Sequence, residues 1–148
     1  MNRIQVLPAH LDGLTTLREL ELGYNEITRL SLPDGGLLRL SALEKLHLEN
    51  NLVLEIPMDD TDEDSAIARS GSQLEMERSQ GIVGLSSLTE LRLDCNKLLI
   101  VPPDVGRLTS LKTLLLAFNR IQWLPVELGE LRDLHCLTLH ENPIMQIR

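Results

Sequence analysis

With 148 residues, the chain is long enough to form one domain that buries its own core. Its formal net charge of −8 argues against nucleic acid or an anionic membrane as the ligand, because binding either would add like-charge repulsion. No apolar run approaches the roughly 20 residues of a membrane span, and the first residues lack the apolar stretch of a secretory signal.

The chain repeats one pattern, LxxLxLxxNxaxxa, in which "a" is an aliphatic residue that is often followed by proline. After a partial repeat at 1–16, the full repeats cover 17–42, 43–87, 88–110 and 111–133, and a partial last repeat covers 134–148. The second repeat is long because it contains the acidic segment 58–79, which carries a net charge of −5. We expect this segment to be a flexible loop on the return half of its coil, where an insertion spares the strands.

Each LxLx stretch alternates apolar and polar residues, which predicts a short strand with one buried face. The apolar side chains expected to point into the core are Leu20, Leu22, Leu46, Leu48, Leu91, Leu93, Leu114, Leu116, Leu137 and Leu139. A coiled coil does not fit, because Leu20 and Leu22 have strand spacing and proline recurs in the units.

An asparagine follows every predicted strand at the same position. A buried asparagine is costly unless it is hydrogen-bonded, but its amide carries both donors and an acceptor. We therefore expect a structural ladder of stacked side chains that satisfy the backbone where each coil bends away from its strand. Its members are Asn25, Asn51, Asn96, Asn119 and Asn142.

Stretches such as LRELELGYNEITRL (17–30) and LTELRLDCNKLLIVP (88–102) resemble the leucine-rich repeat, specifically the 23-residue intracellular type of Ras-suppressor-like and Scribble-like proteins. The resemblance covers nearly all of the chain except 58–79. It implies an α/β fold, a leucine-rich repeat solenoid that forms a right-handed curved β-α superhelix. Such a solenoid has a parallel concave sheet of about five strands, with helices, 3₁₀ turns or extended segments on its convex side.

In solenoids of this kind, the polar positions of the strands face the concave surface and bind partners. The candidate partner-binding residues are Glu21, Lys45, His47, Glu49, Glu90, Arg92, Asp94, Leu115, Phe118 and His140. The N-terminal half of this surface is charged, whereas Leu115, Ala117 and Phe118 are expected to form a small apolar patch. Packing of Phe118 and Tyr24 along the ladder edge, between neighbouring coils, is the alternative.

The sequence contains none of the common catalytic or metal-binding motifs. The histidines show no metal-ligand spacing, and no phosphate-binding loop, GxSxG or HExxH occurs. The run DDTDEDS lacks the glycine and the bidentate glutamate of a calcium loop. The sequence therefore predicts no enzyme, no cofactor and no metal site.

The two cysteines, Cys95 and Cys136, make no disulfide framework. They fall in different columns and two coils apart, beyond disulfide reach, and we expect one surface thiol and one half-buried side chain. A reducing, cytoplasmic compartment is the natural interpretation.

The function that these features favour is a non-enzymatic scaffold that binds a protein partner, one that offers Lys or Arg, on the concave sheet. The alternative is a targeting or regulatory fragment of a larger signalling enzyme, such as a kinase, GTPase or cyclase. The chain begins partway through a repeat, so association through an uncapped N-terminal coil is also expected.

Overall fold

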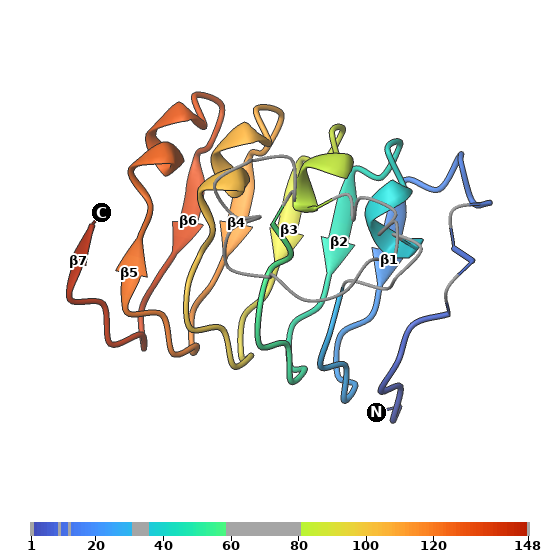
Figure 1. The fold of residues 1–148 in the computed structure, drawn as a ribbon, viewed down its shortest axis with the longest axis horizontal. Coiled ribbons are helices and arrows are strands. Elements are labelled where there is room, and N and C mark those ends of the chain that lie inside the picture. Colours follow the sequence, from blue (N-terminus) through green and yellow to red (C-terminus); the bar gives the residue numbers. More distant parts are fainter. Residues whose placement is uncertain (1, 9, 12, 31–35, 59–80, 148) are drawn as a thin grey trace, which may run out of the picture.

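The computed structural model describes residues 2–8, 10–11, 13–30, 36–58 and 81–147. Five strands form one parallel sheet in the order β1 (Glu19–Glu21), β2 (Lys45–His47), β3 (Glu90–Arg92), β4 (Thr113–Leu115) and β6 (Cys136–Thr138). A second pair, β5 (Trp123–Leu124) and β7 (Gln146–Ile147), forms a two-stranded parallel sheet. Figure 1 shows the coils stacked in a row, with these strands side by side. The expected solenoid with a five-stranded parallel sheet is confirmed.

The return segments of the described coils contain 3₁₀ helices. Of the helices, 3₁₀ turns and extended segments expected on the convex side, the structure therefore shows 3₁₀ helices. They are η1 (Gly36–Arg39), η3 (Ile82–Gly84), η4 (Pro103–Arg107) and η5 (Val126–Glu130). Pro102 and Pro125 precede η4 and η5 in an extended conformation, and i→i+3 hydrogen bonds such as Val105 N to Pro102 O (3.1 Å) shape the turns. None of the described helices is long and apolar enough to cross a bilayer.

Aliphatic side chains from the strands and return segments form one core. The strand leucines of β2, β3 and β4 and the leucines that follow them are fully buried, as the alternating pattern predicts; these are Leu46, Leu48, Leu91, Leu93, Leu114 and Leu116. Leu137 differs from the prediction, because it is 41% exposed. It lies on β6, an edge strand that has a neighbour on one side only, so part of its surface has no described coil against it.

The five asparagines lie at one position of successive coils and bond between them. The side-chain oxygen of Asn96 accepts from Val53 N of the preceding coil (2.9 Å), and its nitrogen donates to Leu48 O (2.9 Å) and Leu93 O (3.1 Å). Asn51 and Asn119 bond in the same way and are buried like Asn96. Asn25 and Asn142, at the two ends of the row, are half-buried. Each asparagine thus ties one coil to the one before it.

The residue before each asparagine adopts a left-handed backbone conformation. These residues are Tyr24, Asn50, Cys95, Phe118 and Glu141, with φ between 54° and 57°. Left-handed backbone disfavours residues with a Cβ by roughly 1–2 kcal/mol each. The turn it makes is followed directly by the ladder asparagine, so the hydrogen bonds of the ladder offset the strain.

The second coil closes around the acidic segment, of which residues 59–79 lie outside the described residues. Ile82 N donates to Pro57 O at 2.9 Å, as Val105 N donates to Pro102 O in the next coil. In that coil only two residues separate the two partners. The backbone on both sides of the segment therefore already has the geometry of an uninterrupted coil.

Replacing Asn96 with alanine should lower the free energy of unfolding by roughly 3 kcal/mol, because the buried Val53 amide loses its acceptor and the Leu48 carbonyl keeps only the bond from Asn51. Asn25→Ala is the matched control, and its cost should be below about 1 kcal/mol because water reaches that site. Urea unfolding of both variants measures the difference. If both variants lose the same unfolding free energy, the stabilisation by the asparagine ladder does not depend on burial.

Deleting residues 58–79 should leave the solenoid folded. The deletion places Gln80 and Gly81 between Pro57 and Ile82, which restores the two-residue spacing of the next coil. Because a shorter loop costs less entropy to close, the free energy of unfolding should stay the same or rise by up to about 2 kcal/mol. Urea unfolding followed by circular dichroism tests this, and loss of a cooperative transition would contradict the alignment of the second coil with its neighbours.

Candidate protein-interaction face

The parallel register aligns the polar strand positions of successive coils into two columns. One column contains Glu19, Lys45, Glu90, Thr113 and Cys136, and the other contains Glu21, His47, Arg92, Leu115 and Thr138. We call the surface formed by these ten side chains the sheet face. Aligning the repeats on LxxLxLxxN places the same residues opposite one another, so the repeat alignment and the observed register agree.

A network of ion pairs links the first three strands of the sheet face. Lys45 Nζ lies 3.2 Å from Glu19 Oε2, and Arg92 Nε donates to Glu90 Oε1 at 2.5 Å. His47 lies between the two groups, with Nδ1 4.0 Å from Glu21 Oε1 and Nε2 3.3 Å from Glu90 Oε1. Glu90 and His47 are therefore held inside this network, whereas the side chain of Glu21 extends into water.

Glu90 is the centre of that network. Its burial alone would raise the pKa of the carboxyl, but the hydrogen bond and charge of Arg92, together with His47, outweigh burial and lower the pKa below its ordinary value. The same hydrogen bond raises the pKa of Arg92. Glu90 is thus a partly buried carboxylate that is held ionised by its neighbours.

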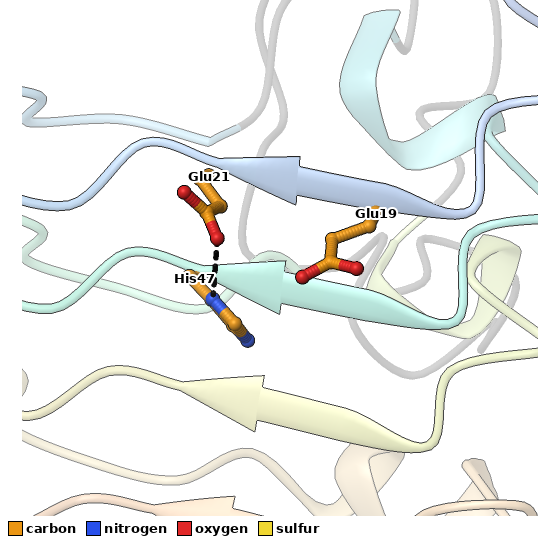
Figure 2. Close-up of side chains that lie close together, drawn as sticks. All are labelled: Glu19, Glu21 and His47. Atoms are coloured by element: carbon orange, nitrogen blue, oxygen red, sulfur yellow. Dashed lines mark ion pairs between the residues drawn. The ribbon is translucent and has the colours of Figure 1, made fainter.

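His47 is a buried member of the sheet face, although a strand residue in its column was expected to contact a partner. Only 8% of its surface is exposed. Its Nε2 is buried without an aligned hydrogen bond, even though Glu90 Oε1 is 3.3 Å away. Figure 2 shows the other nitrogen, Nδ1, pointing toward Glu21, with Glu19 nearby on the same strand.

Two acidic candidates just beyond the strands are occupied by internal contacts. Asp94 Oδ1 accepts from Ala117 N (2.9 Å) and from Thr138 Oγ1 (3.3 Å), which joins three coils. Glu49 packs over Gly23, where a Cβ would lie only 2.5 Å from its Oε1, and its Oε2 is buried without a hydrogen-bond partner. The alternation of apolar and polar residues predicts that Asp94 and Glu49 lie on the polar side of the strand. It does not predict that their carboxylates make contacts within the protein.

The apolar patch expected near the C-terminal end is smaller than predicted. Ala117 is only 2% exposed, so it contributes almost nothing to the surface. Leu115 is half-buried and Phe118 is 52% exposed. The Phe118 ring packs edge-on against His140 of the next coil, with ring centroids 5.2 Å apart. An exposed anchor and packing between coils were expected as alternatives for Phe118, and its ring shows both.

Both cysteines are free and exposed, so Cys95 and Cys136 match the expected absence of a bond between them, but neither is the half-buried side chain that was expected. Glu19 was expected in the charged N-terminal half of the surface but was not among the named partner-binding residues. It lies beside Lys45 in the first column, and the column alignment was the signal that could have found it.

Comparison with known proteins agrees with this architecture. Residues 86–144 match the family model described as "Leucine rich repeat". A leucine-rich repeat protein of Leptospira interrogans aligns with a TM-score of 0.76 and 30% identity over 97% of this chain. The chain is a leucine-rich repeat protein. An internalin of Listeria monocytogenes shares the fold, with a TM-score of 0.65 and 21% identity over 99% of this chain.

Among curated proteins, fibromodulin resembles this leucine-rich repeat protein. The identity is 36% over 112 residues for Bos taurus and 37% for Mus musculus, in each case covering 69% of this chain. The chain spans 27% of the length of these relatives, 30% of the Leptospira protein and 38% of the internalin. Proteins built from such repeats use their extended sheet surfaces for binding protein partners.

Replacing Glu90 with glutamine should make this leucine-rich repeat protein less stable in a pH-dependent way. Because the folded pKa of Glu90 is lowered, its ionised form stabilises the fold above the unfolded pKa, and this contribution is lost as the pH falls through the folded pKa. The difference in unfolding free energy between wild type and Glu90→Gln should therefore be constant near neutral pH and shrink below about pH 4.5. A difference that stays constant in urea unfolding down to about pH 3 would contradict this.

Proposed function

We propose that this leucine-rich repeat protein is a non-enzymatic interaction module that binds a protein partner across its sheet face. The proposal rests on an ordered charged network on the sheet face and on an exposed aromatic side chain in the turn that follows the fourth strand of the same sheet. The network spans β1 to β3, and Phe118 follows β4. A surface of this kind offers charge pairing for specificity and an anchor for affinity.

Charge favours a partner that presents lysine or arginine. Five carboxylates surround this half of the surface, against two cationic side chains, Lys45 and Arg92; the carboxylates are Glu19, Glu21, Glu49, Glu90 and Asp94. The side chain of Glu21 is 74% exposed, and its only ion pair among the described residues is with His47 at 4.0 Å. Glu21 is therefore the carboxylate best placed to pair with a cationic group of a partner.

Phe118 supplies the apolar contact. Its ring is held on one side by His140, while half of its surface stays exposed. Leu115 lies three residues earlier, in the strand column beside Arg92. A fixed aromatic ring loses little conformational entropy on binding, which is why such residues dominate interface energies.

We further propose that the protein belongs to the 23-residue intracellular subtype and works in a reducing compartment such as the cytoplasm. The exposed, unpaired thiols of Cys95 and Cys136 support this, because exposed free cysteines are prone to oxidise in secreted proteins.

The double variant Leu115→Glu and Phe118→Asp should lose partner binding and stay folded. Aspartate tolerates the left-handed backbone at 118, and a glutamate at 115 faces Arg92 across the register. Affinity capture with quantitative mass spectrometry, after circular dichroism has verified the fold, compares the variant with wild type. The expected result is loss of the captured proteins to background.

The matched control is Val126→Asp, which puts a charge on an equally exposed apolar residue of η5, away from the sheet. This variant should capture the same proteins as wild type. If the double variant captures them unchanged, or if Val126→Asp abolishes capture instead, the sheet face is not the binding surface.

A further inference from the structure

The N-terminal corner of the sheet face brings together three side chains with metal-ligating atoms. Glu19 and Glu21 come from β1 and His47 from β2, and one ligand atom of each lies within 4.8 Å of the other two. Figure 2 shows the two carboxylates and the imidazole facing one another across the neighbouring strands. We propose that these three residues form a binding site for a divalent transition metal, with zinc as the best-suited ion.

The donor set fits zinc chemistry. Zinc accepts imidazole nitrogen and carboxylate oxygen at about 2.0–2.2 Å, and tetrahedral ligands then lie about 3.4 Å apart. His47 Nδ1 and Glu21 Oε1 are 4.0 Å apart, so a small rotation of an exposed glutamate closes the gap. The imidazole favours zinc over calcium or magnesium, which prefer oxygen ligands only. Three protein ligands leave one coordination position open.

The buried imidazole is the second, independent observation. Only 8% of His47 is exposed, and its Nε2 is buried without an aligned hydrogen bond, 3.3 Å from Glu90 Oε1. A buried nitrogen without an aligned partner is costly, and a metal on Nδ1 would relieve that cost by fixing the proton on Nε2, where it can bond to Glu90. Its Nδ1 points toward Glu21, with Glu19 on the same strand as Glu21.

The residues on the Nε2 side of His47 resemble those that hydrogen-bond to metal-bound histidines. A metal-bound histidine usually donates its other nitrogen to a carboxylate, which fixes the ring. His47 Nε2 lies 3.3 Å from Glu90 Oε1, and Arg92 holds that carboxylate at 2.5 Å. Glu90 is thus a positioning residue. Metal at Nδ1 would place the proton on Nε2 and complete this hydrogen bond.

Lys45 is the competitor for the site. Its ammonium group lies 3.2 Å from Glu19 Oε2, where it occupies part of the negative potential that a cation would use. Zinc must displace it from Glu19. Removing the lysine charge should therefore strengthen zinc binding, whereas removing a ligand should weaken it.

The test is isothermal titration of the full chain with zinc chloride. Cys95→Ser and Cys136→Ser form the background, because exposed thiols bind zinc on their own. One zinc per chain is expected. Glu90→Gln should weaken binding about 10–100-fold, and Glu21→Gln at least as strongly. Lys45→Met should tighten it. Glu21 is the decisive ligand variant, because its exposed side chain can be changed without disturbing the core.

The controls are His135→Gln and Glu130→Gln, an exposed histidine and an exposed glutamate away from this corner, and both should bind zinc as the background protein does. Imidazole nitrogen chemical shifts in NMR should report zinc on Nδ1 of His47. Absence of binding, equal affinity after Glu21→Gln, or coordination through another histidine would each overturn the proposal. The test requires no protein partner, so it stands apart from the proposed interaction function.

Discussion

The asparagine ladder is the interaction on which the other features of this fold depend. Each coil must turn sharply after its strand, and the turn uses a left-handed residue whose conformation is unfavourable by itself. The buried amides of Asn51, Asn96 and Asn119 offset that cost, because each bonds to its own coil and to the coil before it. Register between coils, and with it the order of the strand columns, follows from these bonds.

Fixed register explains why the sheet face is organised. Side chains 23 or more residues apart become neighbours about 4.8 Å away, and the pairing holds them there. Glu90 can then be stabilised by Arg92 within its own strand and by His47 from the preceding strand, β2. The network limits rotamer freedom before any partner arrives, so less entropy remains to be lost on binding.

The sequence predicted the features that depend on the repeat period and on the alternation of apolar and polar residues. It did not predict features that depend on contacts between coils. The columns and the buried leucines of the central coils follow from spacing, whereas the parallel sheet was implied by the resemblance to the leucine-rich repeat. The exposure of Leu137 depends on its place in an edge strand, and the burial of Ala117 depends on the turn after β4. Asp94 looked like a surface carboxylate, yet its Oδ1 bonds to Ala117 N and Thr138, a contact that no pattern in one strand can reveal.

The corner formed by Glu19, Glu21 and His47 was missed for a related reason. Metal motifs are recognised by short spacings on one helix or loop, whereas in this solenoid two ligands come from one strand and the third from the next coil, 26 residues after Glu21. Residues one coil apart are direct neighbours in space. The ligands of such a site are therefore separated in the sequence by about one repeat length and not by the short spacing of a metal motif. A search for chemistry in such a fold therefore has to compare residues down the columns, and the charge of each coil has to be judged together with the coils beside it.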